Sequence, residues 1–200
     1  MARNDVADFH RLRLTPIDLG VALLLLAALA CGLLLRGQVA NRLETFQSPD
    51  APLQLSYPAD WREAGTLQDV LLNVEDSFVE SPFKTRFTVQ AQDLDPAAPP
   101  SLQELTNRRI DDRSALVGYH FLSSGPTEIA GNAATLIEYA YVAQPIDEPR
   151  RPSLPVVVTA RDYVVVKGAS SYYFSIAAPE SAGEQALATM EQVMRSVQIQ

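Results

Sequence analysis

The sequence predicts an α+β protein, an α/β/α sandwich around a mostly antiparallel sheet, preceded by one N-terminal transmembrane helix. Three observations lead to this fold class. A long apolar run without charges lies near the N-terminus. Short runs in which apolar and polar residues alternate, as in half-buried strands, fill much of the remainder. Two segments that open with Ser-x-x-Glu, a helix-capping signal, lie between and after these runs. The order strands, helix, strands, helix favours a layered α+β fold over a Rossmann-type fold.

The apolar run extends from Leu19 to Leu35, 17 residues without a charge. At about 1.5 Å per helical residue it reaches the low end of what a hydrocarbon core of about 30 Å requires. Arg36 can extend the span by reaching the headgroups. We therefore expect a signal-anchor helix over 17–36, after a cytoplasmic tail over 1–16.

Two other interpretations of this segment remain open. Ala28-Leu29-Ala30 resembles the cleavage site of a secretory signal peptide, and Cys31 is a candidate for lipidation. Against both, the apolar run continues past these positions to Leu35.

The charges that flank the apolar run indicate its orientation. Arg3, Arg11, Arg13 and the α-amine precede the run, whereas Arg36 and Arg42 follow it. Because basic residues are retained on the cytoplasmic side, we expect the N-terminus inside and the C-terminal domain outside the cytoplasm. Arginine outnumbers lysine heavily, which is typical of a GC-rich bacterial genome; we expect a bacterial cell-membrane protein.

Composition limits the partners of the chain. Its 200 residues suggest one domain plus appendages, and the 47% hydrophobic content is too high for a disordered chain. The net charge is −8, and residues 37–200 hold 12 basic against 21 acidic residues. This excess of negative charge disfavours nucleic acid as a partner. The single cysteine, Cys31, excludes a disulfide within the chain and a thiolate zinc site.

After the apolar run we expect a tether over 37–52 and a soluble domain over 53–200. Trp61 should close one end of the core. A helix should open at the capping box Ser101-x-x-Glu104, stop near Gly118 and lie on the surface, with the pair Arg108–Arg109 among its solvated charges. The expected strands cover 53–57, 70–74, 87–92, 119–122, 127–130, 133–142, 156–159 with 163–166, and 172–176.

The second half of the domain contains a hairpin signal and a second helix. Gly131-Asn132 predicts a two-residue turn between strands. Ser181-x-x-Glu184 predicts another capping box, and an apolar stripe after it should pack on the sheet. The stripe consists of Leu187, Met190, Val193 or Met194, and Val197.

Four segments, read together, resemble the Mog1/PsbP-like fold family, and within it the bacterial PsbP-like domains. They are LQLSYPADW, PPSLQEL, EIAGNAATLIEYAYV and YYFSIAAPESAGEQALATMEQVMRSVQI, which span about 50–200. The resemblance implies an α/β/α sandwich without enzymatic activity. It also implies a role in binding, since members of the family bind a small GTPase or photosystem complexes. No binding residue of the family can be matched to a position here.

The chain offers little catalytic chemistry, and we expect neither an enzyme nor a cofactor. A hydrolase would have to use His120, but Ser123 and Ser124 do not lie in the strand-turn-helix elbow of a nucleophile. Asp93 and Asp95 lack the Gly and distal Glu of a calcium loop, so no metal site is predicted.

The connection over 144–155 holds four prolines and is the segment that most suggests a binding site. Its stiffness would lower the entropic cost of binding, and it could present Arg150 and Arg151 to a partner. An ordinary pre-ordered loop remains the alternative. We expect a membrane-tethered, non-catalytic protein-binding or assembly module acting outside the cytoplasm; a small-molecule or lipid-binding domain is the alternative.

Overall fold

The computed structural model describes residues 20–21, 23–32, 42–49, 51–65, 69–144 and 154–200, in two compact units, 1–41 and 42–200. In the first unit residues 20–21 and 23–32 are helical, and their leucine side chains are exposed. Within the described ranges, no helix combines the length and the apolar character needed to cross a membrane. The predicted span over 17–36 lies only partly in these ranges, and the predicted tail over 1–16 lies outside them.

The second unit begins with a strand where a tether was expected. β1 (Leu43–Gln47) pairs antiparallel with β2 (Leu53–Pro58), and β2 also pairs with β10 (Gln198–Ile199) near the C-terminus. The prediction of a tether is therefore wrong for residues 43–47. The reason is that β2, with its alternate residues buried, needs backbone partners on both edges.

A seven-stranded sheet forms the centre of this unit, and every pairing in it is antiparallel. Its order is β3-β4-β5-β9-β8-β7-β6. The strands are β3 (Arg62–Glu63), β4 (Val70–Asp76), β5 (Thr85–Asp93), β6 (His120–Ile129), β7 (Asn132–Ala143), β8 (Val156–Lys167) and β9 (Ser170–Pro179).

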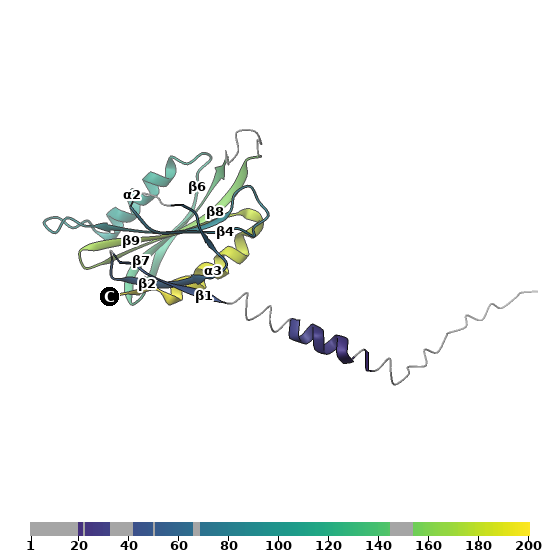
Figure 1. The fold of residues 1–200 in the computed structure, drawn as a ribbon. Coiled ribbons are helices and arrows are strands. Elements are labelled where there is room, and N and C mark those ends of the chain that lie inside the picture. Colours follow the sequence, from purple (N-terminus) through teal and green to yellow (C-terminus); the bar gives the residue numbers. More distant parts are fainter. Residues whose placement is uncertain (1–19, 22, 33–41, 50, 66–68, 145–153) are drawn as a thin grey trace, which may run out of the picture. The chain divides into compact units, whose positions relative to one another are not determined.

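Helices cover both faces of this sheet (Figure 1). α2 (Leu102–Ser114) contacts β7 and β8 on one face, and α3 (Gly183–Ser196) contacts β9 and β2 on the other. The expected layered α+β sandwich is thus confirmed.

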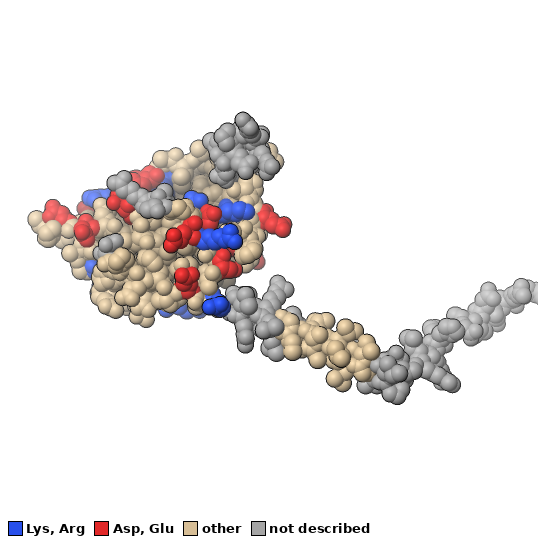
Figure 2. All heavy atoms as spheres, in the orientation of Figure 1, with Lys and Arg blue, Asp and Glu red and all other residues tan. Residues whose placement is uncertain are grey.

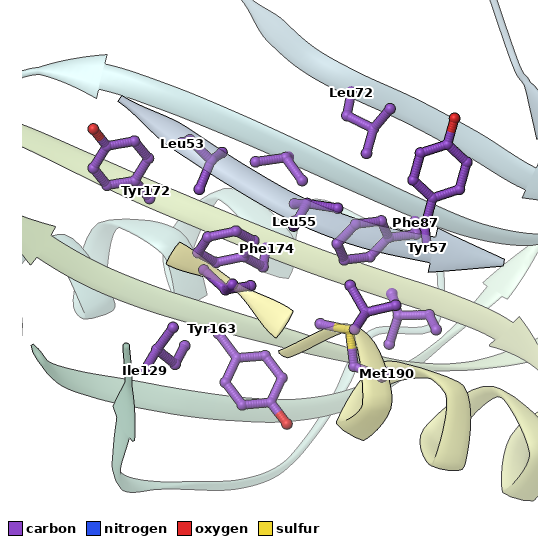
Figure 3. Packing of buried hydrophobic residues seen from close by; sticks show 14 of the residues in the cluster. Leu53, Leu55, Tyr57, Leu72, Phe87, Ile129, Tyr163, Tyr172, Phe174 and Met190 are labelled. Atoms are coloured by element: carbon purple, nitrogen blue, oxygen red, sulfur yellow. The ribbon is translucent and has the colours of Figure 1, made fainter. Parts of the chain in front are cut away.

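The larger core lies between the main sheet, the three-stranded sheet and α3. Leu55 from β2, Phe87 from β5, Phe174 from β9 and Met190 from α3 are fully buried and converge there (Figure 3). Trp61 belongs to the same cluster, as expected. Val193 and Val197 of the predicted stripe are buried too. At the start of the stripe Ala186 is buried, whereas Leu187, which was expected to be buried, is only half-buried.

The predicted helix ends are right in one case and wrong in two. The capping box at Ser101 and Glu104 is present. At the other helix, Ser181 lies in a 3-10 turn (Glu180–Ala182), so α3 starts after Ala182 without a side-chain cap. α2 stops at Ser114, and Gly118 instead supplies a positive φ of 63° in the following turn.

The hairpin between β6 and β7 turns one residue earlier than expected. Ala130 and Gly131 have φ values of 50° and 74°, and Ile129 pairs with Asn132. Two consecutive positive φ values are the mark of a type I′ turn, which matches the twist of the flanking strands. The Asn132 side chain donates to the carbonyl of Ala130 at 2.9 Å, which explains why asparagine follows the turn.

Candidate functional site: an arginine-lined cleft

The face of α2 that packs on the sheet carries two arginines. Leu105, Arg109 and Arg113 lie four residues apart and so share one side of the helix. Leu105 is buried, and the side chains of Arg109 and Arg113 are only 10% and 27% exposed. The prediction of a helix with solvated charges is therefore wrong for Arg109, although Arg108 is exposed.

Polar residues from neighbouring strands of the sheet lie opposite this face of α2. Asp162 on β8 pairs in register with Ser175 on β9, and Ser175 pairs with Thr88 on β5. Gln90 and Tyr139 lie on the same side of the sheet, from β5 and β7. Asp162 is fully buried. A buried carboxylate in the middle of an apolar strand needs charged partners, which the two arginines provide.

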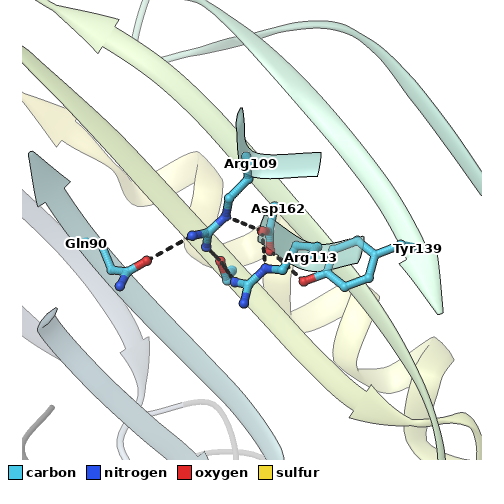
Figure 4. A network of polar contacts seen from close by, with 6 residues as sticks. Gln90, Arg109, Arg113, Tyr139 and Asp162 are labelled. Carbon is cyan, nitrogen blue, oxygen red and sulfur yellow. Dashed lines mark hydrogen bonds and ion pairs between the residues drawn. The ribbon is translucent and has the colours of Figure 1, made fainter. Parts of the chain in front are cut away.

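The two guanidinium groups converge on one carboxylate oxygen (Figure 4). Nε of Arg109 donates to Oδ2 of Asp162 at 2.5 Å, and Nε of Arg113 donates to the same oxygen at 3.0 Å. The Tyr139 hydroxyl donates to the other oxygen at 3.2 Å. Arg109 also donates to Gln90 Oε1 at 3.1 Å and to Ser175 Oγ at 2.7 Å.

Aromatic rings support the arginines. The Arg109 guanidinium carbon lies 5.1 Å from the ring centre of Tyr173, and that of Arg113 lies 5.9 Å from the ring centre of Tyr139. Such cation–π contacts hold the guanidinium planes in place and offset part of their desolvation.

Burial and charge act in opposite directions on the carboxylate. Desolvation alone would raise the pKa of Asp162, but the positive charges of Arg109 and Arg113 outweigh it and hold the pKa below its usual value. Burial, together with the Asp162 charge, raises the pKa of the Tyr139 phenol far above its usual value. Asp162 is therefore ionised and Tyr139 is neutral at physiological pH.

Beside this network the surface is hollowed into a cleft of about 280 Å³. Three arginines line it and no carboxylate does; Arg86, the third, pairs at 3.2 Å with Glu75 outside the lining. Its walls are Val70, Phe83, Arg86, Thr88, Gln90, Arg109, Arg113, Leu116, Tyr139, Tyr141, Ser175, Ile176 and Ala177. We call this the arginine cleft.

In three other hollows of the domain, acidic residues outnumber basic residues. The one beside α3 contains Asp76, Glu80, Glu180 and Glu184 and no basic residue. Two further hollows each hold one more carboxylate than arginines. On the face seen in Figure 2, basic and acidic side chains are interspersed. The arginine cleft is thus a local positive site on an acidic domain.

The residues singled out from sequence do not include those that form the arginine cleft. Arg150 and Arg151 lie outside the described residues. His120 is exposed on β6, and the Ser123 hydroxyl donates to Glu138 at 2.7 Å, not to His120. Asp93 accepts from the Ser170 hydroxyl at 3.2 Å. Among the described residues, no three His, Cys, Asp or Glu side chains lie close enough to hold a metal ion.

With this geometry, the domain is similar to solved structures of one fold class, the Mog1/PsbP-like sandwich. LpqN of Mycobacterium tuberculosis, involved in cell envelope biogenesis, has a TM-score of 0.58 at 9% identity, over 78% of this chain and 90% of that one. Cyanobacterial PsbP of Synechocystis has a TM-score of 0.55 at 13% identity, over 79% and 92%. A point mutant of Mog1 has a TM-score of 0.51 at 11% identity, over 79% and 96%.

These likenesses confirm the expected Mog1/PsbP-like fold, and at such low identities they show the fold alone. No protein-family model matches the chain, and no curated protein matches it in sequence.

Proposed function

We propose that the chain is a membrane-tethered, non-catalytic binding module whose folded domain engages a protein partner outside the cytoplasm. The observation that carries this proposal is the arginine cleft, a positive and partly aromatic hollow on a domain that is acidic elsewhere. Arginine and tyrosine are the residues that most often dominate the energy of protein interfaces.

The similar structures support the extracytoplasmic part of the proposal. LpqN is involved in cell envelope biogenesis, and its fold matches most of this chain. The uncharged run Leu19–Leu35 supports the membrane tether, and the arginines before it support a cytoplasmic N-terminus. We propose 17–36 as the anchor and the folded domain as the exposed part.

The non-catalytic character rests on how the reactive side chains are used. Ser123 and Arg161 both bind Glu138, each at 2.7 Å, and thereby form a surface network. Asp162, the buried carboxylate beside the cleft, is held ionised by two arginines, which makes it a poor proton acceptor.

A lipid-binding role is less well supported. A lipid chain would need an enclosed apolar cavity, whereas the described side chains between the main sheet and its helices form two clusters of buried residues. The hollows described above contain charged residues and open at the surface.

In-cell crosslinking tests whether the domain has a protein partner. The full-length protein is crosslinked in cells and purified from native membranes, and the proteins attached to it are identified by mass spectrometry. We expect one dominant partner. A protein recovered without partners above background would contradict the proposal and would favour a small-molecule ligand instead.

The membrane tether has a separate test. Extraction of membranes with alkaline carbonate should leave the full-length chain in the pellet, and protease added to spheroplasts should digest the folded domain. Release into the supernatant, or protection of the domain until the cells are lysed, would contradict the anchor or its orientation.

A further inference from the structure

The network beneath the arginine cleft carries an excess positive charge. Arg109 and Arg113 share the single carboxylate of Asp162, and no second carboxylate pairs with either guanidinium among the described residues. A net charge of one is thus held where water reaches little of Arg109, whose side chain is 10% exposed, and part of Arg113, whose side chain is 27% exposed. An uncompensated charge in a partly buried site is costly, and an anion from outside would offset the cost.

Among the donors that line the cleft, those of Arg113 Nη1 and the Tyr141 hydroxyl have no hydrogen-bond partner in the described part of the chain. Arg113 binds Asp162 through Nε and Ser175 through Nη2, at 3.0 and 3.4 Å, so Nη1 has no partner among the described residues. The Tyr141 hydroxyl likewise has none, although its ring packs against Tyr139 and Phe83. Both side chains line the cleft. A guanidinium and a phenol together form a suitable donor set for a carboxylate.

Charge and size together select the kind of anion. One monoanion neutralises the network, whereas a phosphate near pH 7 carries more than one charge and would meet the repulsion of an acidic domain. The volume of about 280 Å³ is at the lower end of ligand cavities, which suits one side chain better than a whole cofactor. The apolar walls, among them Phe83 and Leu116, favour apolar residues beside the charged one.

We propose that the arginine cleft binds one carboxylate of the protein partner, an acidic side chain flanked by apolar residues. This inference rests on the proposed binding function and names its recognition chemistry. Arg113 donates to the carboxylate through Nη1, and Tyr141 donates through its hydroxyl. Arg86, which lines the same cleft and shares its charge with Glu75, supplies a further guanidinium.

The test uses the full-length protein in nanodiscs, labelled with 15N-arginine, and two short probes. Acetyl-Leu-Glu-Leu-amide carries one carboxylate, and acetyl-Leu-Gln-Leu-amide is its neutral counterpart. We expect guanidinium signals to shift with the glutamate peptide and to stay unchanged with the glutamine peptide. Because a hydrogen bond to a charged group is worth about tenfold or more in affinity, Arg113→Lys should weaken binding by about that factor.

Arg113 also binds Asp162 in the buried network, so its substitution could affect the fold as well as binding. A second variant separates the two effects. Arg86→Gln combined with Tyr141→Phe leaves the contacts of Asp162 intact and should weaken binding of the glutamate peptide by about tenfold or more. The matched control is Arg108→Gln, which removes one charge from the exposed side of the same helix and should leave the affinity unchanged.

Three outcomes overturn the inference: no shift with the glutamate peptide, equal shifts with both peptides, or tighter binding of inorganic phosphate than of the glutamate peptide. The broader proposal fails in a different way. If the peptide binds as expected but crosslinking in cells finds no partner, the carboxylate site stands and the partner function does not. If the cleft variants still capture the same partner, the partner function stands and this site does not.

Discussion

At the scale of single residues, Asp162 is the residue that compensates the charges of the two arginines on the sheet-facing side of α2. It is fully buried and is the one carboxylate that pairs with Arg109 and Arg113 among the described residues. We expect Asp162→Asn to reduce the free energy of unfolding by about 3–5 kcal/mol, because it leaves two partly buried guanidinium groups without a counter-charge. Urea unfolding followed by tryptophan fluorescence measures this loss. A loss under about 1 kcal/mol, typical of an exposed ion pair, would contradict the account.

Two neighbouring tyrosines provide a matched pair. The buried Tyr119 hydroxyl has no hydrogen-bond partner among the residues that the structure describes, whereas the Tyr139 hydroxyl donates to Asp162. Tyr119→Phe should therefore leave the stability unchanged or raise it by about 1 kcal/mol, while Tyr139→Phe should lower it by about 1 kcal/mol or more. Thermal unfolding of both variants decides this. Equal losses would show that the two hydroxyls are equivalently bonded.

At the scale of elements, the turn of the β6–β7 hairpin contains backbone strain that a single substitution can relieve. Ala130 has a φ of 50°, which costs a residue with a Cβ about 1 kcal/mol relative to glycine. We expect Ala130→Gly to raise the unfolding free energy by about 0.5–1 kcal/mol. The control is Gly131→Ala at a φ of 74°, which should lower it by a similar amount. Destabilisation by Ala130→Gly would mean that a type I′ turn is the wrong description.

Local sequence patterns predict the elements that residues close in sequence determine. The alternation in LQLSY and FTVQAQ predicted parts of β2 and β5 correctly, and the capping box at Ser101 predicted the start of α2. β1 and β10 were missed because each is a short strand without alternation that depends on pairing with β2, which for β10 lies far away in the sequence.

The cleft was missed for a similar reason. Arg109 and Asp162 are 53 residues apart, and Arg109 and Ser175 are 66 apart, so no local pattern joins them. A signal did exist in the sequence. Asp162 interrupts the β run 156–166, and the spacing of Leu105, Arg109 and Arg113 puts charge on the apolar side of the helix.

At the scale of the whole molecule, stability should depend on pH through Asp162. Its pKa is lower in the folded state than the value of about 3.9 in an unfolded chain. The stabilisation is therefore fully present above about pH 4 and is lost as the pH falls through the folded-state pKa. Urea midpoints between pH 2 and 7 should fall steeply at the acid end, and the gap between wild type and Asp162→Asn should narrow there. A gap that stays constant with pH would contradict this assignment.

Photo-crosslinking from inside the arginine cleft in living cells tests directly whether the partner binds there. p-Benzoylphenylalanine would replace Phe83, which lines the cleft and keeps all its hydrogen-bond donors in place, or Phe78, an exposed aromatic residue of the acidic hollow beside α3. We expect one dominant crosslinked protein from position 83, little from position 78, and loss of the product when Arg113→Lys is added. No product from position 83, or the same products from both positions, would contradict the claim that this cleft is where the partner binds.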